Sequence, residues 1–156
     1  MRALIQRTSH ASVTINDDTS ATFEVEPPRT IGTGMVVLLG VGLGDDRACA
    51  EKLWRKISKL RIFEDENGKT NLSISDVHGE AMIVSQFTLY ADCKKGNRPG
   101  FGGAGDPHAA LELYRYFVSL ASRDIPHVAA GEFGADMTIE LANEGPFTIW
   151  LDTDTL

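Results

Sequence analysis

Two short segments hold the polar residues whose types and spacing suit a catalytic or binding site. The first, Ser85-Gln86-Phe87-Thr88-Leu89-Tyr90, continues directly from an apolar run. Residues two apart in a strand face the same way, so Gln86 and Thr88 are predicted to share one face. Because pockets often form where strands end, these polar groups are candidates for lining one. The same pattern also fits an ordinary edge strand with one polar face.

The second segment, Asn143-Glu144-Gly145-Pro146-Phe147-Thr148, lies between two predicted strands. Gly-Pro between strands usually marks only a turn. A cis peptide is inexpensive only before proline, at about 0.5–1 kcal/mol above trans. A cis Gly145–Pro146 bond would hold both carbonyls in a fixed arrangement. Most X-Pro bonds in folded proteins are trans, and the sequence leaves the isomer open.

The usual catalytic signatures do not occur in the sequence. We find no GxSxG, HExxH or Walker A motif, and no GxGxxG ahead of a helix. Cys49 and Cys93 lie far apart without CxxC spacing, which predicts reduced thiols rather than a zinc site or a disulfide. We therefore expect no metal and no cofactor. The histidines are scattered and are predicted to be surface or loop residues: His10, His78, His108 and His127.

The bulk composition indicates one globular domain that spans residues 1–156. Hydrophobic residues make up 42% and charged residues 24%. No apolar run reaches the roughly 18 residues of a membrane span, and the N-terminus turns polar too soon for a signal peptide, so we expect a cytoplasmic protein without membrane contact. The net charge of −7 argues against coating long nucleic acids and against DNA as a partner. A local basic patch at Lys94, Lys95 and Arg98 remains possible, as does a merely solvated loop.

Hydrophobic periodicity predicts a mixed α+β fold. In the helix predicted to begin after Asp45 or Asp46, apolar residues recur at helical spacing on one side, and its lysines and arginines face water. The order of elements predicts an extensive, mostly antiparallel or mixed sheet with two main helices. Strands are expected at 2–7, 11–15, 21–26, 35–41, 81–90, 127–133, 137–141 and 147–151, and helices from 45 or 46 to 60 and over 107–122.

The pair SQFTLY and NEGPFT, with the opening RALIQR, resembles the D-aminoacyl-tRNA deacylase family of bacteria and eukaryotes. The resemblance covers nearly the whole chain and includes LRIFED at 60–65, GNRP at 96–99 and FGADM at 133–137. Two features depart from the family pattern. Phe147 follows Gly-Pro where the family commonly has valine, and the segment 17–34 is longer than the family's short hairpin.

The resemblance implies that family's fold and a homodimer with two active sites at the subunit interface. It also implies a cis Gly145–Pro146 that reaches into the partner's pocket. The substrate would be the 3′ end of D-aminoacyl-tRNA, and also glycyl-tRNA mischarged on tRNA-Ala. Pocket residues with catalytic roles would be Ser85, Gln86, Phe87 and Thr88. Substrate-binding residues would be Asn143, Gly145, Pro146, Thr148, Met137, Phe101 and Arg7, the last bracing the Gly-Pro loop. Lys94, Lys95 and Arg98 would contact tRNA phosphate.

Several mechanisms and functions remain open at this point. Water can attack the ester while the Phe87 and Thr88 amides stabilise the oxyanion, with help from the terminal ribose hydroxyl. Alternatively, the Thr88 hydroxyl is a nucleophile, although no histidine or lysine in its motif is placed to activate it. The competing functions are a non-catalytic dimeric nucleic-acid-binding protein and an editing enzyme for L-aminoacyl-tRNA with a trans Gly-Pro.

Overall fold

The apolar runs of the sequence build one large sheet in the computed structural model, which describes residues 1–17 and 21–156. Residues 18–20, part of the long segment 17–34, lie outside the described residues. The elements are β1 (Arg2–Ile15), β2 (Thr30–Ile31), β3 (Gly34–Gly40), α1 (Arg47–Ile57), β4 (Phe63–Glu64), β5 (Thr70–Leu72), β6 (Glu80–Ser85), a 3-10 helix η1 (Phe87–Tyr90), α2 (Pro107–Asp124), β7 (Val128–Ala130) and β8 (Met137–Asp152).

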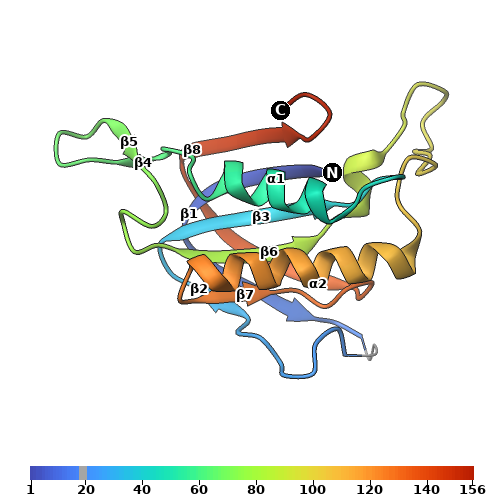
Figure 1. The fold of residues 1–156 in the computed structure, drawn as a ribbon, viewed down its shortest axis with the longest axis horizontal. Coiled ribbons are helices and arrows are strands. Elements are labelled where there is room, and N and C mark those ends of the chain that lie inside the picture. Colours follow the sequence, from blue (N-terminus) through green and yellow to red (C-terminus); the bar gives the residue numbers. More distant parts are fainter. Residues whose placement is uncertain (18–20) are drawn as a thin grey trace.

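The main sheet is mixed, and its strand order is β2-β1-β3-β6-β7, with β8 paired to β1. β3, β6 and β7 run parallel to one another, whereas β1 pairs antiparallel with β2, β3 and β8. β4 and β5 form a separate hairpin that projects from one end of the molecule (Figure 1). The predicted α+β class with a mixed sheet is therefore confirmed.

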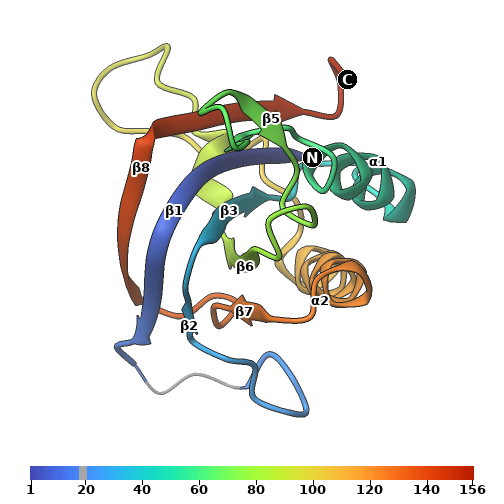
Figure 2. The same ribbon diagram turned by 90° about the vertical axis from the view of Figure 1, so that its left-hand side faces the viewer.

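One face of the sheet is covered by the two helices, and the opposite face is enclosed by β1 and β8. Alternation in β3 directs Met35, Val37 and Leu39 into the core beneath α1 and α2, and directs Val36 and Leu38 to the opposite side. Both helices lie on the same side of the sheet, while β1 and β8 curl around the other side (Figure 2). That side carries a smaller second apolar cluster, in which Val36 and Met82 are fully buried and Leu38 is partly buried.

Local signals in the sequence predicted where the helices begin. The Asp46 side chain caps α1 by accepting a hydrogen bond from the Cys49 amide at 2.9 Å. Pro107 opens α2, and Asp106 caps it. The helix ends were less accurate, because α1 ends at Ile57 rather than at residue 60 and α2 continues past 122 to Asp124. A hydrogen bond joins the C-terminal parts of α1 and α2, since the Trp54 indole N–H donates to Asp124 Oδ2 at 2.8 Å.

Several predicted strand boundaries were wrong. The strands expected at 2–7 and 11–15 form one continuous β1, and those at 137–141 and 147–151 form one continuous β8. No strand forms at 21–26, where the backbone bends and its polar groups bond to other parts of the chain. The strand predicted over 127–133 contains only Val128–Ala130. The strand predicted over 81–90 ends at Ser85 and is followed by the 3-10 helix.

A shifted register between β1 and β8 places Gly145 and Pro146 outside the regular ladder. Thr8 pairs with Asn143 and Gln6 pairs with Thr148, so β8 advances by more residues than β1 between these two pairs. The extra residues of β8 form a bulge, which changes the face to which the following side chains point. Gly145–Pro146 therefore lies in a bulge of one long strand rather than in a hairpin loop.

Tyr114 of α2 ties the helix layer to the sheet. Its ring is fully buried, and its hydroxyl lies 2.8 Å from the Ile83 carbonyl oxygen and 2.9 Å from that of Gly131. Burial raises the pKa of this phenol, so the hydroxyl stays protonated and is available to donate. The hydroxyl thereby links the end of β6 to the loop that follows β7.

We predict that Tyr114→Phe lowers the free energy of unfolding by about 1–3 kcal/mol, because it removes the donor from two buried carbonyls. Tyr116→Phe is the matched control on the same helix. Its hydroxyl bonds to Glu51 at the surface, so the loss should stay below about 0.5 kcal/mol. Urea unfolding followed by circular dichroism measures both values. Equal losses for the two variants would contradict the role assigned to Tyr114.

Candidate functional site

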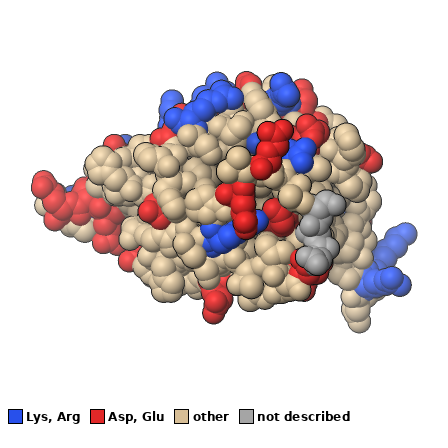
Figure 3. All heavy atoms as spheres, turned by 90° about the horizontal axis from the view of Figure 1, so that it is seen from below, with Lys and Arg blue, Asp and Glu red and all other residues tan. Residues whose placement is uncertain are grey.

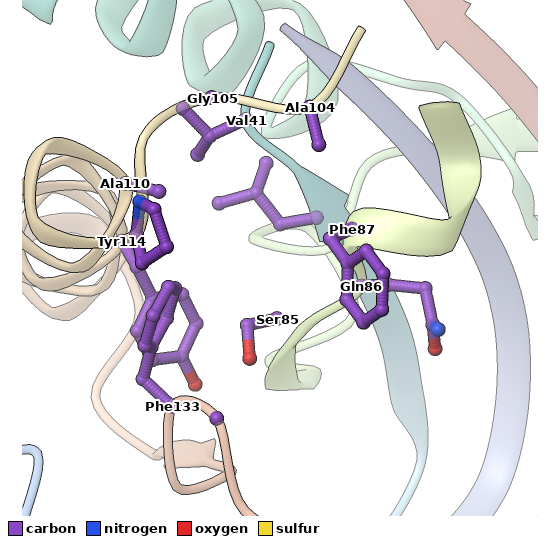
Figure 4. A pocket seen from close by; sticks show the side chains of 12 residues that line it. Val41, Ser85, Gln86, Phe87, Ala104, Gly105, Ala110, Tyr114 and Phe133 are labelled. Carbon is purple, nitrogen blue, oxygen red and sulfur yellow. The ribbon is translucent and has the colours of Figure 1, made fainter. Parts of the chain in front are cut away.

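A cavity of about 320 Å³ opens where the parallel strands β3 and β6 end. The carboxyl ends of parallel strands meet at one edge of a sheet, and α2 begins beside that edge. Figure 4 shows Ser85 in the centre, Tyr114 and Phe133 on one side, and Phe87 on the other. The lining is mainly apolar: Leu39, Val41, Ser85, Gln86, Phe87, Ala104, Gly105, Pro107, Ala110, Tyr114, Phe133 and Gly134.

Three of the four predicted catalytic residues line this cavity, and they differ in orientation. The Ser85 hydroxyl points into the cavity (Figure 4) and makes no hydrogen bond with the described residues. Phe87 is 57% exposed at the rim, and its ring meets the Phe101 ring edge-on at 4.9 Å between centroids. The side-chain amide of Gln86 points away from the cavity and donates to Thr88 Oγ1 at 2.6 Å. Thr88 is exposed and does not line the cavity.

Gln86 and Thr88 do meet, but not as neighbours on one face of a strand. The backbone N–H of Gln86 donates the last hydrogen bond of this strand, to the Leu39 carbonyl at 2.7 Å. The chain then turns into η1. This turn packs closely on β3, where a Cβ added to Gly40 would lie 3.1 Å from the Gln86 carbonyl oxygen and 3.2 Å from Leu89 Cβ. The strand therefore ends early because a glycine on its neighbour allows the chain to fold over it.

The amides of Phe87 and Thr88 stand at the start of η1. The first N–H groups of a helix have no acceptor within that helix. The backbone N–H groups further along this segment already have acceptors. That of Leu89 donates to the Gln86 carbonyl, and that of Ala91 donates to the Thr88 carbonyl. The beginning of η1 thus offers main-chain donors next to the cavity, an arrangement that can stabilise negative charge on a bound oxygen.

The Gly145–Pro146 bulge is held from inside by Arg7. Its peptide bond is cis, and Gly145 adopts φ +118°. Arg7 is buried, and its guanidinium donates to the Glu144 carbonyl at 3.2 Å and to the Ile62 carbonyl at 2.7 Å. Asn143 closes the bulge by accepting from the Phe147 amide at 3.0 Å. Its side-chain amide also donates to the Thr148 hydroxyl at 2.9 Å.

Within one chain the two motifs do not meet. Asn143, Gly145, Pro146 and Thr148 contribute nothing to the cavity lining, although Gly145 and Pro146 are exposed. Met137 contacts the backbone near Gly131 without lining the cavity. Of the substrate-binding residues predicted from sequence, only Phe101 lies near the cavity, through its contact with Phe87.

Comparison with known proteins decides the family. The family model for D-Tyr-tRNA(Tyr) deacylase matches residues 4–152. The chain belongs to the D-Tyr-tRNA(Tyr) deacylase family. It is 51% identical to the D-aminoacyl-tRNA deacylase of Lactobacillus helveticus, over 97% of this chain and 99% of that protein. It is 52% identical to the D-aminoacyl-tRNA deacylase of Pseudoalteromonas translucida, over 95% and 97% of the two chains. The resemblance read from SQFTLY and NEGPFT is therefore confirmed.

Solved structures support the same fold. The chain is similar to a c-Myc DNA unwinding element binding protein with a TM-score of 0.86, at 37% identity over 97% of this chain and 98% of that one. It is also similar to a probable eukaryotic D-amino acid tRNA deacylase with a TM-score of 0.74, at 18% identity over 96% and 97% of the chains. The second likeness concerns the fold alone. The deacylase fold expected from the resemblance is thus confirmed.

The predicted tRNA-binding residues of this deacylase-family chain lie on a projecting loop. Lys94, Lys95 and Arg98 are exposed between Asp92 and Gly100, which pair as an isolated bridge. In the described part of the chain none of the three forms an ion pair with a carboxylate. Figure 3 shows one group of Lys and Arg at one end of the molecule and one group of Asp and Glu at the opposite end, with further residues of both charges between them.

Sequence reasoning missed residues that shape the deacylase-family cavity. Tyr114 belongs to the helix predicted over 107–122 and was given no functional role, yet it lines the cavity. Glu132 was not singled out, yet it is buried and bonds to the Thr22 amide at 2.8 Å and to the Arg29 guanidinium at 3.0 Å. Burial opposes its ionisation, but these hydrogen bonds outweigh burial and lower the pKa of its carboxyl. No local pattern marked these residues, because their partners lie far away in sequence.

Among residues 1–17 and 21–156, no three His, Cys, Asp or Glu side chains are grouped so that they could hold a metal ion. Across the same residues, no helix has the length and apolar character needed to cross a membrane. Cys49 and Cys93 are both free thiols.

Proposed function

We propose that the cavity at the ends of β3 and β6 hydrolyses the ester bond between a D-amino acid and the 3′ end of tRNA. The observation that carries this proposal is the position of the SQF motif on an open apolar cavity, in a chain of the D-Tyr-tRNA(Tyr) deacylase family. Water adds to the ester carbonyl, and the bond to the ribose oxygen then breaks. The products are the free D-amino acid and a tRNA whose terminal hydroxyl has taken up the proton.

The main chain supplies the catalytic groups. The amides of Phe87 and Thr88 hold the oxyanion that forms when water attacks, since donors fixed in advance stabilise developing charge most effectively. Ser85 and Gln86 position the ester and the water in the cavity. The terminal ribose hydroxyl of the substrate assists the water, so the site needs no side-chain base. The Thr88 hydroxyl is not the nucleophile, because it lies outside the cavity lining and accepts a hydrogen bond from Gln86.

Handedness is selected by a second copy of the chain. The Gly–cisPro bulge of one subunit reaches into the cavity of its partner and directs the Gly145 and Pro146 carbonyls at the substrate's α-carbon. An L side chain would collide with them, whereas a D-residue points its side chain away and donates hydrogen bonds through its ammonium. Asn143, Thr148 and Arg7 keep the bulge in place. Glycine has no side chain, so glycyl-tRNA mischarged on tRNA-Ala is also hydrolysed.

Two observations support a homodimer of single-domain chains. The exposed bulge adds nothing to the cavity of its own chain, so a second copy is the natural recipient. The face of the sheet opposite the helices also has apolar side chains that are only partly covered, including Trp150 at 47% exposure and Leu38. A two-fold interface would bury these residues and place both bulges against cavities at once. Met137 and Phe101 would then border the substrate.

The tRNA contact is confined to its 3′ end. Lys94, Lys95 and Arg98 contact phosphates near that end, and their exposed loop can adapt to the strand. The remaining surface carries excess negative charge, which limits the footprint on the rest of the tRNA. Such a substrate fits a cytoplasmic enzyme that removes D-amino acids before translation uses them.

Non-catalytic DNA binding is the second candidate function. Its support is the likeness to a protein described as binding a DNA unwinding element. The net charge of −7 disfavours it, because DNA affinity depends on many cationic contacts to phosphate. A deacylation assay distinguishes the two candidates, since nucleic-acid binding without release of the amino acid would favour DNA binding.

We predict that the chain hydrolyses D-Tyr-tRNA at least about a hundredfold faster than L-Tyr-tRNA, a difference of about 2.7 kcal/mol in transition-state stabilisation. Glycyl-tRNA(Ala) should be hydrolysed at a rate closer to that of the D-substrate. Release of labelled amino acid measures all three under the same conditions. Equal rates for D- and L-Tyr-tRNA would contradict the chiral filter, and no release from any of them would contradict the enzyme.

We predict that Thr88→Ala keeps kcat/KM for D-Tyr-tRNA within about tenfold of the parent chain, because the Thr88 amide, which holds the oxyanion, is retained. Removing a covalent nucleophile typically costs about 10⁴–10⁶ in kcat. Thr88→Val serves as a second test, since it removes the hydroxyl and keeps the shape. A loss of about 10⁴ or more in both variants would mean that Thr88 attacks the ester itself.

We predict that two inactive variants restore activity when they are mixed. Gly145→Ala strains a residue at φ +118° and places a Cβ 3.0 Å from Arg7. This disturbs the bulge and displaces the carbonyls proposed to bind the substrate's ammonium, so the D-substrate is no longer held. Ser85→Leu occupies the cavity. In a mixed dimer one site carries both changes and the other carries neither, so an equal mixture should recover about a quarter of the parent activity.

Gly68→Ala is the matched control, because it has a comparable φ of +70° in open space and should stay fully active. Light scattering gives the oligomeric state of each preparation. Dimers that form mixed species but regain no activity would show that the bulge does not act across subunits.

A further inference from the structure

Thr22 joins three separate parts of the chain through its three polar groups. The residue is 2% exposed. Its amide donates to Glu132 Oε2 at 2.8 Å, and its hydroxyl accepts from the Phe133 amide at 2.6 Å. Its carbonyl accepts from the Arg115 guanidinium of α2. Every hydrogen-bonding group of this buried residue is therefore used to hold the loop after β7 against α2.

Arg29 makes a second attachment to the same loop. Its guanidinium donates to Glu132 Oε1 at 3.0 Å and also to the Ala130 carbonyl. The Ala130 amide donates to the Pro28 carbonyl at 3.1 Å. The segment that runs from residue 21 to 29 thus bonds to both the main chain and the side chains of 130–133. Figure 1 shows this segment below the sheet, near β2 and β7.

An aromatic row continues from the 21–29 segment to the cavity wall. The Phe23 ring lies 5.9 Å from the Tyr114 ring, which lies 5.9 Å from the Phe133 ring. Tyr114 and Phe133 form one wall of the cavity, and Ser85 stands between that wall and Phe87 (Figure 4). The distance between the two walls therefore depends on where the 131–134 loop is held.

We propose that the 21–29 segment is a positioning element for the reaction, in which Thr22 and Glu132 fix the Phe133 wall and so set the width of the cavity. Neither residue lines the cavity, so both act through Phe133. A wider cavity holds the substrate less tightly without moving the η1 amides on the opposite wall. The inference rests on the proposed function, since the ligand is the D-aminoacyl end of tRNA.

We expect loss of the Thr22 contact to raise KM and to leave kcat nearly unchanged. In Thr22→Val the Phe133 amide loses its buried acceptor, and KM for D-Tyr-tRNA should rise roughly tenfold. The value of kcat should change by less than about twofold. Thr22→Ser keeps the acceptor and should restore the parent KM. Val25→Ser is the matched control, because Val25 belongs to the same segment and is 83% exposed.

A double-mutant cycle shows whether Thr22 acts through Phe133. Phe133→Ala removes the wall itself, so adding Thr22→Val to it should change KM no further. Additive effects on KM would overturn the proposal, as would a Thr22→Val variant that melts at a lower temperature but keeps the parent KM. If Thr22→Val does not fold, Glu132→Gln takes its place, because it keeps the size of the side chain and weakens the contact to Arg29.

A measurement that does not depend on catalysis tests the role of Thr22 independently of the proposed deacylase activity. Hydrogen exchange at the Phe133 amide, followed by NMR, should be slow in the parent chain and in Thr22→Ser and faster in Thr22→Val. Equal exchange in all three would overturn the proposal. A parent chain with slow exchange at Phe133 that hydrolyses no aminoacyl-tRNA would instead refute the proposed function.

Discussion

The pairing of β1 with β8 across a shifted register is the constraint on which the arrangement of the molecule depends. Ile139 and Ile149 are both odd-numbered residues of one strand, which in a regular ladder would share a face. Here Ile139 packs in the smaller apolar cluster and Ile149 packs in the helix-covered core. Two register shifts lie between these residues, and their β1 partners Val13 and Ile5 are divided between the same two clusters. The extra residues of β8 between Asn143 and Thr148 place Gly145 and Pro146 outside the ladder, where both residues are exposed.

The cavity depends on a second local interruption of the sheet. β6 stops pairing after Ser85, and the 3-10 turn folds over Gly40 of the neighbouring strand. If β6 continued as a strand, its amides would be engaged in the ladder and would face no cavity. Tyr114 fixes the other side of the opening by bonding to carbonyls near the end of β6 and in the loop that follows β7. Both proposed functional segments are thus places where regular pairing is broken and the main chain becomes available to a ligand.

The sequence predicted elements whose signals are local. The apolar run ahead of Val41, the Asp46 cap and Pro107 all lie within a few residues of the structure that they specify. Prediction from the sequence failed where the structure of a segment depends on a residue far away in the chain. Nothing near Ser85 indicates that Gly40, on another strand, allows a turn there. The Gly-Pro pair suggested a turn between two strands, whereas pairing with β1 on both sides of the bulge keeps β8 a single strand.

The candidate site was predictable to the same extent. Ser85 and Gln86 were found because their polarity interrupts an apolar strand, Phe87 was found through the family resemblance, and all three line the cavity. Tyr114 and Phe133 read as ordinary core residues, because the sequence does not distinguish an apolar side chain at a cavity wall from one within the core. Thr22 was assigned to a strand that does not form, and its role depends on contacts more than a hundred residues away.

A site that relies on main-chain groups must hold its backbone more firmly than one that relies on side chains, since a backbone donor cannot adjust by rotating. The buried polar side chains of the described residues follow this requirement. Arg7 and Thr8 bond to carbonyls around the bulge, and Thr22 and Glu132 bond around the cavity wall. Burying such groups is favourable only when their hydrogen bonds are satisfied. Among the buried polar residues of 1–17 and 21–156, only Thr153, whose hydroxyl accepts from the N-terminal amine, lies away from both places. The interior polarity of this chain is therefore concentrated where the proposed reaction needs fixed main-chain geometry.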